Sequence, residues 1–215
     1  MFDLVLFDYD GTTLDSDEMI IVTFIELYKK YRPTYVATIE HMMTFSGPPI
    51  KETLRNEFPD VPFDVIYNDF ARISRANYEE HTHLYPYVEE LIIELKKRGI
   101  KVGLVTSKLR GMTDYTFSLF GIDGYFDISI CGDEVSNTKP DPEGVLKAME
   151  MCEVTDKSKV LYVGDNNIDY MTAKNAGVKI AIVDWSQRKD TLIGVPDYII
   201  TSFDKFFKEV GYEED

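Results

Sequence analysis

The stretch that most constrains this chain is an apolar run of strand length, residues 4–7, that ends in two aspartates. Asp8 and Asp10 are separated by one residue, and Gly11 follows at once. In an open α/β sheet, ligands bind just beyond the carboxyl ends of the strands. One carboxylate there can act as a nucleophile, a second as acid and base, and both can bind a hard cation. A surface turn of the Asp-Gly type would explain this motif in isolation, so its meaning depends on how the later strands end.

Further apolar runs of strand length recur in the second half of the chain, at residues 101–105, 126–130, 160–163, 179–183 and 198–200. Helical patterns separate several of them, at residues 88–95, 110–120 and 142–152. Strands that alternate with helices in this way are typical of an α/β fold. We therefore predict a doubly wound, Rossmann-like sheet whose strands are mostly parallel.

Roughly 65 residues between the first two strands contain no strand-like run, which is more than a crossover connection needs. Asp17 begins a helical pattern that ends before Pro33. Further helices are predicted at residues 34–44, 50–58 and 63–82. We interpret this insert as a small helical cap domain, residues 15–83, and assign residues 1–14 and 84–215 to the Rossmann-like core.

The charge balance limits the partners of the chain. It carries 23 basic and 38 acidic residues, a net charge of −15, which opposes nucleic acid or an anionic membrane as a partner. An anionic substrate must therefore meet local positive charge. The chain begins without a positively charged targeting region, and no apolar run approaches the ~18 residues of a membrane span, so we expect a cytoplasmic protein. These features leave the oligomeric state open.

Polar side chains follow the later strands in a way that matches the first. Thr106 and Ser107 end the second strand, Asp165 and Asp169 follow the fourth, and Lys139 lies in a Pro-rich loop between them. Each could be explained alone, as a strand-end turn, a helix cap or a solvated lysine. The carboxyl ends of parallel strands meet at one edge, however, and carboxylates gathered there repel each other unless a divalent cation lies among them. All-oxygen ligation points to magnesium.

Taken in order, these four segments resemble the motifs of the haloacid dehalogenase-like superfamily of aspartate-nucleophile hydrolases. The helical insert directly after the first motif is similar to the cap of the subclass that contains phosphoglycolate phosphatases, pyrophosphatases and β-phosphoglucomutases. The resemblance covers the whole chain. It implies a magnesium-dependent phosphohydrolase that acts through an aspartyl-phosphate on a small phosphorylated molecule.

The resemblance implies roles for the acidic residues. Asp8 would be the nucleophile, and Asp10 would protonate the leaving group and then activate water. Magnesium would be held by Asp8, the backbone carbonyl of Asp10, and Asp165. Thr13 stands where the family usually has an aliphatic residue, and there we expect altered packing rather than lost chemistry.

The resemblance also implies a phosphoryl-binding set. Thr106 and the amide of Ser107 would bind the transferring phosphoryl group, together with the Gly11 turn. Lys139 would neutralise that group and orient the nucleophile, so Thr106 and Lys139 join the two aspartates as catalytic candidates. Asp169 would orient Lys139 or a metal-bound water. Phosphoryl transfer needs positioning and electrostatic stabilisation, which a cation, a lysine and hydroxyls at helix starts supply.

Substrate assignment rests on a narrower likeness to the bacterial pyrophosphatases that resemble phosphoglycolate phosphatases. It is carried by residues 45–49, 105–110, 164–166, 174–177 and 184–185. Inorganic pyrophosphate is the first candidate substrate, and 2-phosphoglycolate or a sugar phosphate is the alternative. Gly47, Arg75, Asn77 and His81 of the cap could reach a second phosphate, or could be polar positions on a solvated helix face.

Two other classes of function remain open. A phosphoglucomutase-type transferase would need a bisphosphate primer and would interconvert sugar phosphates. A non-catalytic binding module would keep the fold alone, but no member of the catalytic set is missing from this sequence.

Overall fold

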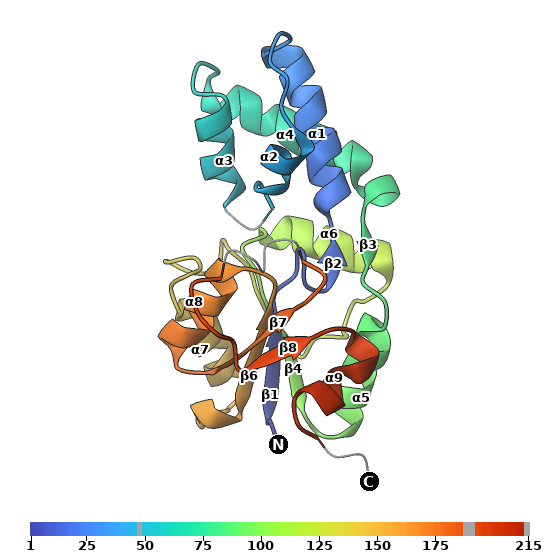
Figure 1. The fold of residues 1–215 in the computed structure, drawn as a ribbon, viewed down its shortest axis with the longest axis vertical. Coiled ribbons are helices and arrows are strands. Elements are labelled where there is room, and N and C mark those ends of the chain that lie inside the picture. The colour runs from blue at the N-terminus through green and yellow to red at the C-terminus, as the bar shows by residue number, and fades with distance from the viewer. Residues whose placement is uncertain (47–48, 187–191, 213–215) are drawn as a thin grey trace. The chain divides into compact units, whose positions relative to one another are not determined.

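A computed structural model of the protein describes residues 1–46, 49–186 and 192–212. The chain forms two compact units (Figure 1). Met1–Thr13 and Leu84–Asp215 make up the first, here the core unit, and Leu14–His83 the second, here the helical unit. Within the described ranges, no helix has the length and apolar character needed to cross a membrane.

The core unit is built on one six-stranded parallel sheet. Its strand order is β5 (Ile128–Ile130), β4 (Lys101–Val105), β1 (Leu4–Phe7), β6 (Val160–Gly164), β7 (Lys179–Val183) and β8 (Tyr198–Ile200). Strand β1 is central, and its Phe7 pairs with Leu104 of β4 and Val163 of β6. All four residues of β1 are buried, as expected for a parallel strand covered on both faces. The predicted α/β class with a parallel sheet is confirmed.

The order of the strands reverses next to β1. From β1 the chain builds outward through β4 and β5, and it then returns to β6 and builds the other way through β7 and β8. Such a reversal opens a crevice at the carboxyl ends of the two strands beside it. The sheet topology therefore indicates a binding site among the residues that follow β1 and β6.

Helices cover both faces of this sheet (Figure 1). On one face α7 (Glu143–Met151) packs against α8 (Asn167–Ala176), and the other is covered by α5 (Val88–Lys97) and α9 (Phe206–Glu209). The core unit also contains α6 (Arg110–Phe120) and the short 3₁₀ turns η1 (Lys157–Lys159) and η3 (Phe203–Lys205). A large apolar cluster from β1, β4, β6 and β7 packs under α7 and α8 and has nearly no exposure to solvent.

The helical unit consists of α1 (Asp17–Tyr31), α2 (Ile39–Met43), α3 (Ile50–Glu57) and α4 (Phe63–His81). Helices α1 and α4 form its main packed pair, around a core that includes Phe24, Leu27 and Phe58. The predicted helix over 34–44 is wrong in extent, because only residues 39–43 are helical. Thr38 accepts a hydrogen bond from the His41 N–H at 3.1 Å and so starts α2 late.

Two short strands were not predicted. β2 (Leu14–Asp15) and β3 (His83–Leu84) pair near the boundary between the units. Two residues are too few to show the alternating pattern by which strands are predicted, so these strands could not be found from the sequence.

A glycine allows close packing at the centre of the sheet. A Cβ atom on Gly103 of β4 would lie 2.6 Å from Leu6 Cδ2 and 2.7 Å from Ile128 Cγ2. Both distances are shorter than a carbon–carbon contact, so a methyl group here would force the buried side chains of Leu6 and Ile128 to shift. Gly111 in α6 is a natural comparison, because a Cβ there meets no atom within 4 Å.

We expect Gly103→Ala to lower the free energy of unfolding by about 1–3 kcal/mol, because the methyl group overpacks a closed contact between strands. Gly111→Ala, the same change on an open helix surface, should leave stability unchanged or raise it by up to about 1 kcal/mol. Urea denaturation followed by circular dichroism measures both values. Equal stability of the two variants would contradict the packing described here.

Candidate active site

The turn after β1 fixes the first two aspartates. The N–H of Asp8 donates to Val163 O at 2.8 Å, so Asp8 continues the register of the sheet. The N–H groups of Thr12 and Thr13 both donate to Tyr9 O, which closes the turn, and Gly11 adopts a φ of 83° that favours glycine. The Thr13 hydroxyl also donates to Asp8 O at 3.2 Å, a contact that an aliphatic residue would not make.

The turn after β6 brings two further carboxylates together. Asn166 caps α8, because its Oδ1 accepts hydrogen bonds from Ile168 N at 2.7 Å and Asp169 N at 3.3 Å. Asp169 in turn accepts from the N–H of Asp165 at 3.1 Å. The approach requires Gly164, since a Cβ there would lie 2.3 Å from Asp169 Cβ.

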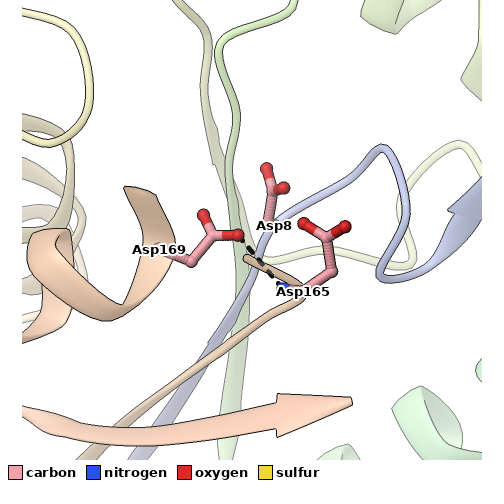
Figure 2. A group of neighbouring side chains, drawn as sticks. All are labelled: Asp8, Asp165 and Asp169. Carbon is pink, nitrogen blue, oxygen red and sulfur yellow. Dashed lines mark hydrogen bonds between the residues drawn. The ribbon is translucent and has the colours of Figure 1, made fainter. Parts of the chain in front are cut away.

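Three carboxylates converge beyond the ends of β1 and β6. Asp8, Asp165 and Asp169 each offer an oxygen within 4.8 Å of the others, and they are 4%, 0% and 0% exposed (Figure 2). Lys139 enters the same cluster, with its Nζ 2.7 Å from Asp8 Oδ1 and 2.7 Å from Asp169 Oδ1. The cluster thus holds three carboxylates against one ammonium.

This imbalance sets the electrostatics of the site. Burial, followed by the charge of Asp169, raises the pKa of Asp8 to about 8, although Lys139 acts in the opposite direction. Burial alone would lower the pKa of Lys139, but Asp169 and Asp8 outweigh it and hold that pKa well above its usual value. Lys139 therefore stays protonated, and its single positive charge lies among three carboxylates.

The donor set fits a hard divalent cation. It consists of oxygen atoms only, which suits magnesium, calcium or manganese rather than zinc. Asp165 accepts hydrogen bonds at both carboxylate oxygens, from Asn166 Nδ2 at 2.6 Å and from Ser186 Oγ at 2.9 Å. Both oxygens of Asp169 are engaged, one by Lys139 and the other by the N–H of Asp165. The three buried carboxylates together form the oxygen donor set for such a cation.

Asp10 lies apart from this buried cluster. Its side chain is 24% exposed, and its Oδ1 lies 3.0 Å from the Nζ of Lys108. Lys108 was not among the predicted site residues. Its place directly after Thr106 and Ser107 was the available signal, since it follows the end of a central strand.

The predicted phosphoryl-binding residues of the second strand lie at the end of β4. Thr106 is buried, and its N–H donates to Ile130 O at 3.0 Å. Gly132 packs directly on Ser107, because a Cβ on it would lie 2.5 Å from Ser107 O. Thr106 and Lys139 line one small cavity. The structure thus brings Thr106 and Lys139 together.

The loop that carries Lys139, residues 131–142, is held at both ends. The guanidinium of Arg110 donates to both carboxylate oxygens of Glu134, at 3.1 and 2.7 Å. The carboxylate of Glu143 accepts from the N–H groups of Ser136 and Asn137, at 2.7 and 2.9 Å. These contacts tie the loop to α6 and α7, so the position of Lys139 is set by the core of the unit.

Sequence reasoning missed Tyr162. This tyrosine is buried in the middle of β6, and its hydroxyl donates to Val105 O at 3.0 Å. The same hydroxyl lies 3.3 Å from both Lys139 Nζ and Asp169 Oδ1. A tyrosine within an otherwise aliphatic strand could have indicated this contact. A buried phenol needs a hydrogen-bond partner, and polar groups lie near the end of the strand.

The predicted cap residues belong to the helical unit. Arg75 is exposed on α4, and the Asn77 amide donates to Ile73 O at 3.0 Å and to Glu26 Oε1 at 3.3 Å. His81 Nδ1 lies 3.3 Å from Glu18 Oε1. Gly47 lies outside the described residues. A role for these residues in binding stays a prediction.

Comparison with known proteins places this geometry in a family. A family model described as haloacid dehalogenase-like hydrolase matches residues 5–183. A pyrophosphatase PpaX from Halalkalibacterium halodurans is 31% identical over 209 residues, 96% of each chain. A pyrophosphatase PpaX from Bacillus velezensis is 35% identical over 201 residues, 91% of this chain and 90% of the relative.

A solved structure shows the same similarity. A Bacteroides fragilis protein assigned to the haloacid dehalogenase-like hydrolases superposes with a TM-score of 0.85 at 26% identity, over 96% of this chain and 100% of that one. The resemblance drawn from the four motifs is confirmed. Because the family match and both relatives span most of its length, the chain belongs to the haloacid dehalogenase-like hydrolase family.

Proposed function

We propose that this protein is a magnesium-dependent phosphohydrolase that acts through an aspartyl-phosphate on a small anionic phosphate. The observation that carries the proposal is the buried Asp8 carboxylate, held by Lys139 at 2.7 Å among further carboxylates at the switch point of the sheet. A nucleophile in this setting is oriented by a cation and shielded from water. Membership of a hydrolase family supports the same reaction class.

Each core residue has a role in this reaction. The Asp8 carboxylate attacks phosphorus, the bond to the leaving oxygen breaks, and Asp10 gives that oxygen its proton. Asp10 then takes a proton from the water that hydrolyses the aspartyl-phosphate. Lys139 and Thr106 stabilise the charge of the transferring group, with the Ser107 amide and the Gly11 turn.

The cluster would hold its metal through Asp8, Asp165 and the Asp10 carbonyl. A bound Mg²⁺ supplies positive charge to the phosphoryl oxygens and relieves the repulsion among the carboxylates. Asp169 keeps Lys139 in position, since its Oδ1 lies 2.7 Å from Nζ. The helical unit is proposed as the cap.

Pyrophosphate is the proposed first substrate, because the two curated relatives reported above are named pyrophosphatases. 2-Phosphoglycolate and sugar phosphates are the alternatives. A mutase would interconvert sugar phosphates when primed with a bisphosphate. A binding module would release no phosphate from any of these compounds.

Purified protein with Mg²⁺ is expected to release phosphate fastest from pyrophosphate in a panel with 2-phosphoglycolate, sugar phosphates and p-nitrophenyl phosphate. EDTA should abolish release, and added Mg²⁺ should restore it, because the metal supplies charge that the cluster lacks. A malachite green assay measures both. Absence of phosphate release from the whole panel would contradict the proposed function.

Asp8→Asn is expected to lower kcat by more than about 10³-fold while the protein still folds, because the amide cannot attack phosphorus. Asp123→Asn is the matched control, since Asp123 is exposed and far from the motifs in sequence. Circular dichroism verifies folding of both variants. Substantial turnover by Asp8→Asn would remove Asp8 as the nucleophile.

The stability of the metal-free protein is expected to depend on Asp8. Its pKa is about 8 in the folded state, against an ordinary 3.8. The folded state thus binds the Asp8 proton more tightly than the unfolded state does. The stability that protonated Asp8 contributes is complete below about pH 4 and is lost as pH rises to about 8. In EDTA, the Tm of the wild type should fall relative to that of Asp8→Asn between about pH 5 and about pH 8.

Mg²⁺ should reverse this loss, and differential scanning fluorimetry measures it. The increase in Tm with Mg²⁺ is expected to be larger at the higher pH and to shrink in Asp165→Asn, which removes one carboxylate of the cluster. Asp123→Asn should keep the full increase. A Tm that does not respond to Mg²⁺ at either pH would contradict a metal site in this cluster.

A further inference from the structure

Lys108 is held by hydrogen bonds of its backbone and by an ion pair of its side chain. Its N–H donates to Thr106 Oγ1 at 3.1 Å, and its carbonyl accepts from Gly132 N at 2.9 Å. The side chain is 11% exposed, and its Nζ lies 3.0 Å from Asp10 Oδ1 and 5.7 Å from the centre of the Tyr9 ring. The backbone is thus tied on both sides, and the ammonium is directed at the loop after β1.

The two lysines at this edge of the sheet differ in what they can do. Lys139 lies between Asp8 and Asp169, with 7% of its side chain exposed, so its charge is shared by two buried carboxylates. Lys108 contacts Asp10, whose side chain is 24% exposed against 6% for Asp8. Of this pair, Lys108 is therefore the cation whose carboxylate partner is more accessible to a bound molecule.

We infer that Lys108 binds the non-reacting anionic group of the substrate, a second phosphoryl group in pyrophosphate, and so selects substrates whose leaving group is itself an anion. The inference rests on the proposed function, in which the leaving oxygen contacts Asp10. The phosphorus bonded to that oxygen then lies close to Nζ, which is 3.0 Å from the same carboxylate. An ammonium has three N–H donors, so it can hold Asp10 and a phosphoryl oxygen together.

A purely structural role for Lys108 makes a different prediction. If Lys108 only neutralises Asp10, its loss should impair every substrate equally, whatever the leaving group carries. If it binds the second anionic group, the loss should depend on the charge of the leaving group. A comparison of two substrates that share the transferred phosphoryl group separates these explanations.

The test compares pyrophosphate with p-nitrophenyl phosphate. Both transfer the same phosphoryl group, but the leaving group of p-nitrophenyl phosphate carries no second phosphoryl group. Lys108→Met should lose about 10- to 100-fold more kcat/KM on pyrophosphate than on p-nitrophenyl phosphate, as expected for one lost charge-assisted hydrogen bond. Lys108→Arg should recover most of the loss, because it keeps the charge. Lys205→Met, a change at an exposed lysine outside the site, should affect neither substrate.

Binding provides a readout that does not need turnover. Isothermal titration calorimetry with Mg²⁺ compares Asp8→Asn with Asp8→Asn/Lys108→Met, using pyrophosphate and inorganic phosphate as ligands. The second variant should bind pyrophosphate about 10- to 100-fold more weakly and inorganic phosphate nearly as well.

Equal losses on both substrates, or equal weakening of both ligands, would overturn the inference while leaving the proposed function intact. A wild-type protein that hydrolyses neither substrate would instead contradict the proposed function. In that case the calorimetric comparison still decides whether Lys108 binds the second phosphoryl group.

Discussion

The structure of the site depends on one buried ammonium among carboxylates. Lys139 bridges Asp8 and Asp169 at 2.7 Å each, and the Tyr162 hydroxyl lies 3.3 Å from its Nζ. Removing such charges from water is costly unless each has a partner in good geometry. Lys139 pairs with two of the three clustered carboxylates, so three negative groups lie around one ammonium. In the proposed function, a divalent cation would supply the positive charge that the carboxylates need.

The sheet supplies the rigidity that this arrangement needs. Asp8 follows β1 and Asp165 follows β6, the two neighbouring strands at which the strand order reverses. Two glycines then permit close approach: Gly164 admits the Asp169 side chain, and Gly132 admits the backbone of Ser107. The site is therefore held by backbone packing and strand register, which suits a reaction that depends on positioning.

An acidic protein that is proposed to act on an anionic phosphate needs positive charge concentrated at its site. The chain has a net charge of −15, yet Lys139 and Lys108 both approach aspartates of the first motif. Their partners differ, since Lys139 lies between two buried carboxylates and Lys108 contacts the more exposed Asp10. In the proposed function, Lys139 would orient the nucleophile and Lys108 would bind the remainder of the substrate. The proposed role of Lys108 would place one source of substrate selection in the core unit.

Much of this protein could be predicted from local pattern alone. Apolar runs such as Leu4–Phe7 and Val160–Gly164 define the strands, and the four motif segments place their polar residues at the strand ends, because a strand and the turn after it are encoded by adjacent residues. The start of α2 was misjudged because its cap at Thr38 competes with a longer helical pattern. The family resemblance already implied that Asp169 could orient Lys139, and the structure places them 2.7 Å apart. Only the tertiary structure showed that Lys108 contacts Asp10 and that the Tyr162 hydroxyl contacts both Lys139 and Asp169. These pairings depend on strand order and on close approaches at glycine, and no local stretch of sequence determines either of them.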